Sequence, residues 1–184
     1  MKKRLFVAIN LPENIRDGIQ SAVEPLKNKL ETVRFSSAEN WHITLSFLGY
    51  QERGAIPAIS AAVQKTAERF QPPLISLNKM VYGPTDKHGK MIWLIDKNRE
   101  DGGLSSIAKF LWENLKKEGV EFKIDYPVFS MHITLARFDK LPPPRPHLPE
   151  LNLKFSPNSI DVMESSLKKT GAEYAIIEGF KFHD

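Results

Sequence analysis

Two short segments of the chain have nearly the same sequence, and each contains a histidine and a threonine. Trp41–Leu45 reads Trp-His-Ile-Thr-Leu, and Met131–Leu135 reads Met-His-Ile-Thr-Leu. The chain has only 5 histidines, so chance would repeat the His-Ile-Thr-Leu tetrapeptide in only about one such chain in a thousand. Because imidazole gains and loses protons near neutral pH and a hydroxyl donates hydrogen bonds, the repeated segments predict a site for acid–base chemistry.

Paired histidines and threonines suit the attack of a nucleophile on a phosphodiester. One histidine, His42 or His132, can remove a proton from the nucleophile while the other donates a proton to the leaving group. Thr44 and Thr134 can donate hydrogen bonds to the non-bridging phosphate oxygens as negative charge develops on them. The residue types therefore predict a metal-free reaction at a phosphate.

A metal centre or a serine hydrolase would need residues that the two segments do not supply. A catalytic zinc ion usually has three protein ligands, whereas two histidines supply two, and no Asp or Glu shares the histidine side of either segment. Ser46 and Ser130 share the parity of the histidines, but the chain has no Gly-x-Ser-x-Gly motif. It also lacks the glycine-rich motifs of nucleotide cofactor sites. We therefore expect neither a metal nor a cofactor.

Each repeated segment has the alternation of apolar and polar residues that is typical of a β-strand. Residues two apart on a strand point to the same face. His42 and Thr44 are therefore expected on one face of their strand, and His132 and Thr134 on one face of the other. The opposite faces carry only apolar residues, which predicts that they are buried and hold the histidines in place.

The remaining patterns predict helices and strands in an α+β arrangement with antiparallel sheets. A helix is expected from about Pro12 to Leu30, with Asn10 as its cap and Pro25 as a kink or break. Two further helices are expected over Ile56–Phe70 and Leu104–Lys117. The expected strands are Leu5–Ile9, Val33–Phe35, Trp41–Phe47, Leu74–Tyr82, Met91–Asp96, Met131–Phe138, Ile160–Leu167 and Tyr174–Phe182.

The composition is that of a globular chain without disulfides. The 184 residues fit one domain, 1–184, or two closely joined lobes. With 41% hydrophobic residues and no cysteine, the chain can form a core, while disulfides and thiolate chemistry are excluded. The basic Lys2–Arg4 and the apolar Leu5–Ile9 imitate a signal peptide, but the apolar run stops at Asn10 and predicts a first strand. We expect a cytoplasmic monomer with no membrane partner.

The net charge of the chain, and the two residues Arg137 and Phe138 that follow the second segment, are relevant to contact with nucleic acid. A net charge of +4 suits a polyanionic partner such as RNA, although an ordinary basic protein has the same balance. Arg137 has the wrong parity for the face of His132 on a regular strand, but a bulge or a strand end would let it reach RNA. The alternative is a solvated strand end. Phe138 has the right parity to stack on a base, whereas core packing is the more common fate of such a residue.

On these residues the chain resembles the 2H phosphoesterase superfamily. Within it, the chain looks like the bacterial and archaeal RNA 2′,3′-cyclic phosphodiesterases, once called 2′-5′ RNA ligases. Two residues depart from the usual family pattern, Trp41 where Leu is usual and Met131 where Pro often stands, and both lie on the face away from the histidines. The segments that carry the resemblance are Arg4–Pro12, Asn40–Gly49, Ile92–Leu94, Phe129–Arg137 and Glu164–Tyr174.

The resemblance implies a fold, a reaction and roles for the motif residues. It implies two pseudo-symmetric lobes, each an antiparallel sheet backed by helices, around a central cleft. It implies hydrolysis of RNA 2′,3′-cyclic phosphate ends to 2′-phosphomonoesters without a cofactor, with 2′-5′ RNA ligation as the reverse reaction. By the family's convention His42 is the proton donor and His132 the proton acceptor, and Thr44 and Thr134 bind the phosphate.

Two other functions fit the same residues. A 2H phosphoesterase could act on a small cyclic nucleotide, such as ADP-ribose 1″,2″-cyclic phosphate. An RNA-binding module could use the His-Thr pairs only to hold phosphates, and it would bind RNA without turnover.

Overall fold

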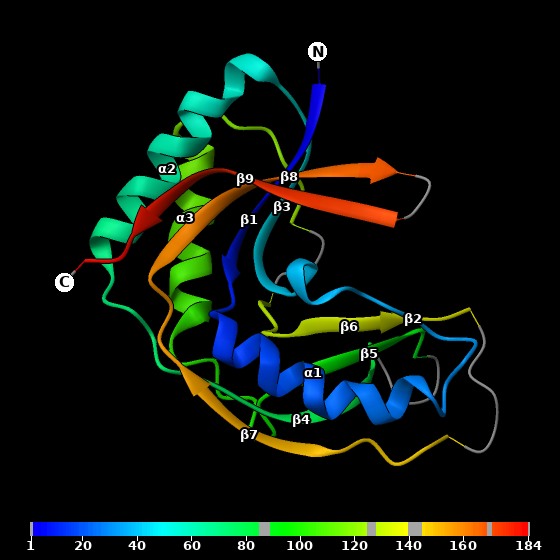
Figure 1. The fold of residues 1–184 in the computed structure, drawn as a ribbon. Coiled ribbons are helices and arrows are strands. Elements are labelled where there is room, and N and C mark those ends of the chain that lie inside the picture. The colour runs from blue at the N-terminus through cyan, green and yellow to red at the C-terminus, as the bar shows by residue number, and fades with distance from the viewer. Residues whose placement is uncertain (1, 85–88, 125–127, 140–144, 169–170, 184) are drawn as a thin grey trace.

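The chain folds into two antiparallel β-sheets and three α-helices (Figure 1). The structure, a computed structural model, describes residues 2–84, 89–124, 128–139, 145–168 and 171–183. Sheet A has the strand order β3-β1-β8-β9, and sheet B has the order β2-β6-β5-β4-β7. The predicted α+β class with antiparallel sheets is confirmed.

Sheet A is covered on one face by two helices, which lie beside it in Figure 1. Both helices were predicted within one residue of their observed bounds, α2 (Ile56–Arg69) and α3 (Leu104–Lys117). β1 is buried on both faces from Leu5 to Ile9, because helices cover one face and aromatic side chains cover the other. The strands of sheet A are β1 (Lys2–Asn10), β3 (His42–Glu52), β8 (Ser159–Lys168) and β9 (Gly171–Lys181).

Sheet B is covered by the remaining helix, α1 (Glu13–Lys27), which runs along it in Figure 1. The helix approaches the edge strand β7 closely at Gly18, where a Cβ atom would come 2.8 Å from Leu153 Cδ2. β7 has no counterpart among the predicted strands. The strands of sheet B are β2 (Arg34–Phe35), β4 (Ile75–Gly83), β5 (Met91–Ile95), β6 (Ile133–Arg137) and β7 (Glu150–Phe155).

The two sheets share one hydrophobic core. The main cluster of buried side chains includes Val7 and Ile43 of sheet A together with Ile92 and Ile133 of sheet B. Both sheets are also assembled from distant parts of the chain. Sheet A pairs its first strand, β1, with β8 near the end, and sheet B pairs β2 with β6. The two lobes therefore fold around common contacts, and these contacts bring β3 against β6.

The start of α1 differs from the prediction. Asn10 does not cap the helix, because it is the last residue of β1 and its side-chain amide donates to Asp161. The residue that precedes the first turn is Pro12, whose backbone is extended. Pro25 lies inside α1 without ending it, and the helix stops two residues later, at Lys27 rather than at Leu30. Proline removes only its own hydrogen bond there, close to the end of the helix.

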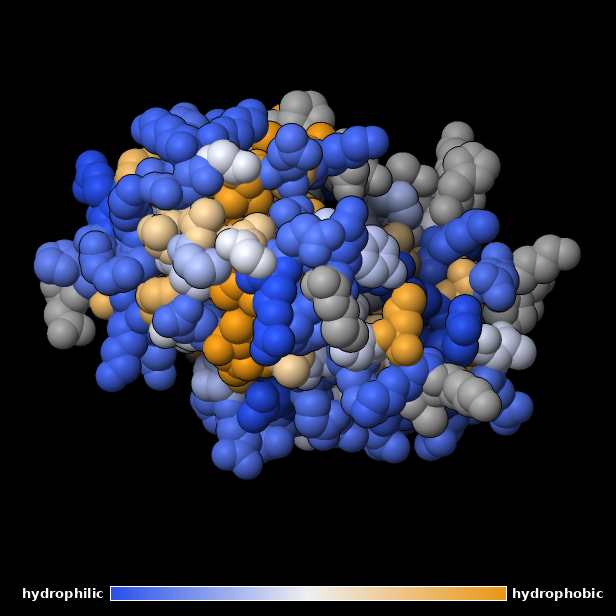
Figure 2. Space-filling view, turned by 90° about the horizontal axis from the view of Figure 1, so that it is seen from above, coloured by the Kyte–Doolittle hydropathy of each residue, from blue (hydrophilic) through white to orange (hydrophobic). Residues whose placement is uncertain are grey.

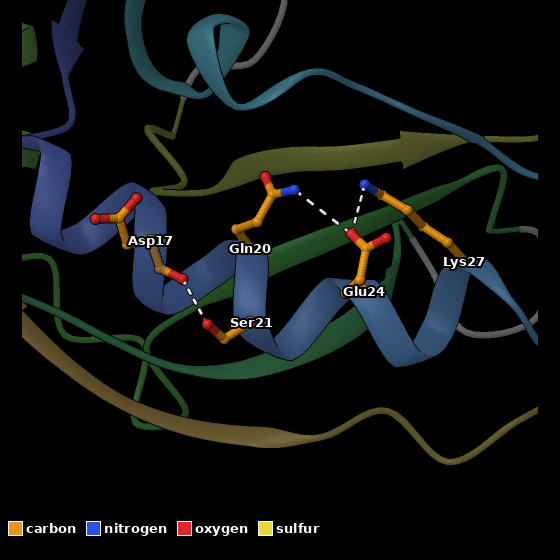
Figure 3. Close-up of polar contacts among 5 residues, drawn as sticks. All are labelled: Asp17, Gln20, Ser21, Glu24 and Lys27. Atoms are coloured by element: carbon orange, nitrogen blue, oxygen red, sulfur yellow. Dashed lines mark hydrogen bonds and ion pairs between the residues drawn. The ribbon is translucent and has the colours of Figure 1, made fainter.

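Polar contacts along the exposed side of α1 join residues one turn apart (Figure 3). Gln20 and Lys27 both contact the carboxylate of Glu24, at 3.4 and 2.9 Å. The hydroxyl of Ser21 donates to the carbonyl of Asp17 at 2.9 Å. Exposed pairs of this kind contribute only a few tenths of a kcal/mol each, so the packing of the buried side of α1 contributes more to its stability than these contacts do.

Hydrophilic residues cover most of the face in Figure 2, with hydrophobic residues gathered mainly in one band. The structure contains no helix, among the residues that it describes, that is long and apolar enough to cross a membrane. The large hydrophobic side chains that are most exposed are Phe47, Tyr50, Leu74, Ile124, Val128, Leu167 and Ile176.

Candidate active site

The first motif histidine, His42, begins β3 and is half-buried between aromatic rings. Its Nδ1 lies 2.7 Å from the backbone carbonyl oxygen of Asn40. Its ring centroid is 4.9 Å from that of Phe6 and 5.1 Å from that of Tyr174, the latter edge-on. These contacts hold the imidazole plane and remove part of its water.

The second motif histidine, His132, lies directly before β6. The expected strand begins at Met131, whereas the observed one begins at Ile133, yet the burial of the residues still alternates from 131 to 135. The Nδ1 atom of His132 lies 2.8 Å from the backbone carbonyl oxygen of Ser130. This bond repeats the bond of the first histidine, each made two residues back along the chain.

Both imidazoles present the same nitrogen for proton transfer. A backbone carbonyl oxygen only accepts hydrogen bonds, so Nδ1 of His42 and of His132 must each carry the hydrogen. In the neutral ring this leaves Nε2 as the proton acceptor, and in the charged ring Nε2 carries the proton that can be given up. Either ring can therefore serve as acid or base through Nε2.

The charges of the two rings interact. Burial lowers the pKa of His42 and the charge of His132 lowers it further, while the hydrogen bond to Asn40 acts in the opposite direction. Burial also lowers the pKa of His132, as does the charge of Arg137, and the hydrogen bond to Ser130 opposes them. The two rings are thus close enough that a proton on one disfavours a proton on the other.

Each of the two motif strands contains a β-bulge, and the bulge is at the same position of the motif in both. Residues 41–48 and 131–138 have the same burial class at every position. In each strand the register shifts directly after the motif threonine, and Leu45 and Leu135 are the extra residues. A bulge places two successive residues toward the same side and reverses the parity of everything that follows.

The bulge moves Arg137 onto the face that carries Thr134. Thr134 pairs with Trp93 and Arg137 pairs with Met91, and these partners are two apart on β5, so they share a face. The corresponding residue of β3 is Phe47, whose side chain is 53% exposed. We call the face of β3 and β6 that carries the histidines, the threonines and these two residues the histidine face. Arg137 therefore lies on the face that carries the motif residues, as a bulge was expected to allow.

Phe138 does not lie on the histidine face: of its two predicted fates, core packing is the one observed, and stacking on a base is not. The reversed parity turns it into the core, where it is 4% exposed and meets the ring of Tyr82 edge-on. The equivalent residue of β3, Leu48, is equally buried at 4%. No ring face of Phe138 is open to a base.

Trp93 is a site residue that the sequence patterns do not reveal. Its indole stacks on the imidazole of His132, with centroids 4.1 Å apart and planes inclined by 26°. Gly83 makes room for the indole, because a Cβ atom there would come 2.4 Å from Trp93 Cδ2. Strand parity puts a residue on a face but does not link strands that are far apart in the chain, so no signal in the sequence joins Trp93 to His132.

A buried carboxylate lies beside the first motif. Asp161 of β8 pairs with Ala8, and Ala8 pairs with Thr44, so all three lie on one face of sheet A. Asp161 is 4% exposed and accepts hydrogen bonds from Asn10 Nδ2 at 2.7 Å and Ser159 Oγ at 2.8 Å. Within the described part of the chain, no three His, Cys, Asp or Glu side chains are grouped so that they could hold a metal ion.

Comparison with known proteins identifies relatives over the whole chain. The model of the family described as LigT like Phosphoesterase matches residues 9–93, which include the first motif. The RNA 2′,3′-cyclic phosphodiesterase of Methanothermobacter thermautotrophicus is 30% identical over 191 residues, which cover 98% of this chain and 100% of the relative.

Solved structures with the same fold are also similar in sequence. The protein TT0787 of Thermus thermophilus has a TM-score of 0.79 and 25% identity, over 97% of each chain. E. coli LigT, in its complex with 3′-AMP, has a TM-score of 0.76 and 25% identity over the full length of both chains. The resemblance drawn from the paired motifs is confirmed, and the chain belongs to the LigT-like phosphoesterase family of the 2H phosphoesterase superfamily.

Proposed function

We propose that this protein hydrolyses 2′,3′-cyclic phosphate ends of RNA to 2′-phosphomonoesters. The name of the archaeal relative supports a phosphodiesterase that acts on RNA. The observation that carries the proposal is a pair of imidazoles, each held through Nδ1 by a backbone carbonyl, whose charges interact. Each is followed on the same face by a half-buried threonine hydroxyl, Thr44 or Thr134.

The reaction needs one proton removed and one proton supplied. Thr44 and Thr134 hold the non-bridging oxygens of the cyclic phosphate. Nε2 of His132 takes a proton from water as the water oxygen bonds to phosphorus, and the bond from phosphorus to the 3′ oxygen breaks. Nε2 of His42 gives its proton to that 3′ oxygen, which leaves a 2′-phosphate. With an RNA 5′ hydroxyl as the nucleophile in place of water, the same steps form a 2′-5′ linkage.

The assignment of the two roles follows the family's convention, and one cation that differs between the motifs is consistent with it. Arg137 lies on the face of His132 and its charge lowers the pKa of that ring. The corresponding residue beside His42 is the uncharged Phe47. A neighbouring cation favours the neutral imidazole, which suits His132 to accept a proton, and the donor role of His42 follows the family's convention.

Product analysis tests the proposed reaction. An oligonucleotide with a 2′,3′-cyclic phosphate end is incubated with the protein in EDTA, and the products are separated against synthetic 2′-phosphate and 3′-phosphate standards. We expect the 2′-phosphate alone, formed at an undiminished rate in EDTA. A 3′-phosphate product would contradict the assigned leaving group, and binding without any product would favour a non-catalytic RNA-binding module.

The rate should depend on pH as a bell with its maximum on the acidic side of neutrality. One ring must be charged and the other neutral, and burial lowers both pKa values from about 6.5. The maximum of kcat/KM is therefore expected below about pH 6.5. Because Arg137 lowers the pKa of His132, Arg137→Gln should move the acidic limb to higher pH, and Arg137→Lys should move it less. A profile that does not change between wild type and Arg137→Gln would contradict the coupling.

A second candidate substrate is a small cyclic nucleotide. E. coli LigT has been crystallised with 3′-AMP, and a 2′,3′-cyclic mononucleotide carries the same cyclic phosphate as an RNA end. The ratio of kcat/KM on a cyclic-phosphate-ended oligonucleotide to kcat/KM on the 2′,3′-cyclic mononucleotide separates the two. A ratio near one would favour the small substrate.

We also propose that residues 1–184 act as one bilobal domain. The shared core and the pairing of β1 with β8 support this, because neither lobe can form its sheet from one continuous part of the chain.

A further inference from the structure

Two arginines lie directly opposite each other at the edge of sheet B. Arg34 of β2 pairs with Arg137 of β6, and both side chains are exposed. β2 is the outermost strand on that side of the sheet. Residues directly opposite on neighbouring strands point to the same face, with strands about 4.8 Å apart.

The shared face is the histidine face. Arg137 pairs with Met91 on its other side, so Met91, Arg137 and Arg34 form one row across three strands. The next residues along, Phe35 and Ala136, also pair, and both pack against the core. The row therefore begins beside the second motif and ends at the open edge of the sheet, with both guanidinium groups on the same side as His132.

In the described part of the chain, neither arginine has an ion-pair partner. Among the residues that the structure describes, carboxylates form ion pairs with lysines, such as Lys3 with Glu164 and Lys65 with Glu118, and none pairs with Arg34 or Arg137. Arg137 Nη1 instead contacts the sulfur of Met91 at 3.3 Å. Like charges directly opposite on paired strands destabilise a sheet, and an anion that lies over both arginines would remove this repulsion.

We infer that Arg137 and Arg34 form a track for the phosphates of the RNA backbone that precede the terminal cyclic phosphate. The inference rests on the proposed function and adds the class of substrate, an oligonucleotide rather than a mononucleotide. The terminal phosphate lies with the histidines and threonines, Arg137 is next along the face, and Arg34 follows at the sheet edge, where a longer chain can leave the protein. Guanidinium groups bind phosphate oxygens in pairs and keep their charge at every relevant pH.

Arg34→Ala tests the track, because Arg34 has no place in the acid–base step. The ratio of kcat/KM on a four-nucleotide RNA with a 2′,3′-cyclic end to kcat/KM on the 2′,3′-cyclic mononucleotide should fall about tenfold, as expected for one lost charge-assisted contact. Most of the change should lie in KM. Arg34→Lys should recover part of the ratio. Arg53→Ala, which removes another exposed arginine outside both sheets, should leave the ratio unchanged. An unchanged ratio in Arg34→Ala would overturn the inference.

A binding measurement separates failure of the track from failure of the proposed reaction. The affinity for a 2′-phosphate-ended oligonucleotide is measured by fluorescence anisotropy at several salt concentrations. Arg34→Ala should weaken binding and lower the slope of log Kd against log salt by about 0.7, the value for one phosphate of a single strand. If Arg34→Ala lowers the affinity and the salt slope as expected but wild type produces no 2′-phosphate, the proposed reaction is wrong and the track stands. If turnover occurs and Arg34→Ala binds as tightly as wild type, the track is wrong and the reaction stands.

Discussion

His42→Ala and His132→Ala are each expected to lower kcat on a cyclic-phosphate-ended oligonucleotide by about 10²–10⁴-fold, the usual contribution of a general acid or base. Both rings are half-buried at the edge of the core, so the variants should keep the wild-type fold, which circular dichroism and thermal unfolding would verify. His183→Ala removes an exposed histidine near the end of the chain and should retain full activity. Full activity in either motif variant would exclude the two-histidine mechanism.

A substrate with sulfur in place of the 3′ oxygen distinguishes the acid from the base. A thiol has a lower pKa than an alcohol, so a thiolate leaves without being protonated. If His42 is the proton donor, His42→Ala should recover most of its rate on the sulfur substrate, whereas His132→Ala should stay inactive. The reverse pattern would exchange the two roles. The two motifs are too similar in sequence to assign the roles, but the sulfur substrate can assign them, because the leaving group meets only one of the two rings.

Thr44→Val and Thr134→Val are each expected to lower kcat by about 10²–10³-fold, the effect of removing one hydrogen-bond donor to a developing negative charge. Valine has the shape of threonine but lacks the hydroxyl, so the strand and its bulge should be kept. KM should change less than kcat, because the negative charge on the phosphate oxygens increases toward the transition state.

Serine at the same positions is the matched control for the threonines. Thr44→Ser and Thr134→Ser keep the hydroxyl and lose the methyl group, so most of the activity should return. If serine lowers kcat as much as valine does, then keeping the hydroxyl does not preserve activity, and the phosphate role of the threonine is wrong. Melting temperatures of the four variants would show whether packing at the half-buried positions explains the loss.

The regular elements could be predicted where a local pattern decides them. The bounds of α3 were those of its periodic apolar run, and the hairpin strands β4 and β5 lay where alternation placed them. α1 started later than predicted because Asn10 was taken up by β1 and by its bond to Asp161. β7 is an edge strand with alternate residues exposed, and nothing in its own residues identifies the neighbour with which it pairs.

The candidate site residues also divide into those that a local pattern predicts and those that depend on pairing between distant strands. His42, Thr44, His132 and Thr134 could be named from type and spacing, because side-chain parity over three residues needs no knowledge of the rest of the fold. Phe138 was assigned to the wrong face because the assignment assumed a regular strand, and the extra residue, Leu135, is defined only by the register against β5.

The sequence by itself predicted which groups react, and it determined that each histidine shares a face with a threonine and to which family the chain belongs, since all of these depend on short stretches of neighbouring residues. Only the tertiary structure decided that the charges of the two imidazoles act on each other, that Trp93 stacks on His132, and that the bulges turn Arg137 outward and Phe138 inward. It also decided that Arg34 stands opposite Arg137. Pairing between distant strands sets each of these relations, and pairing depends on the packing of the whole core rather than on any local pattern.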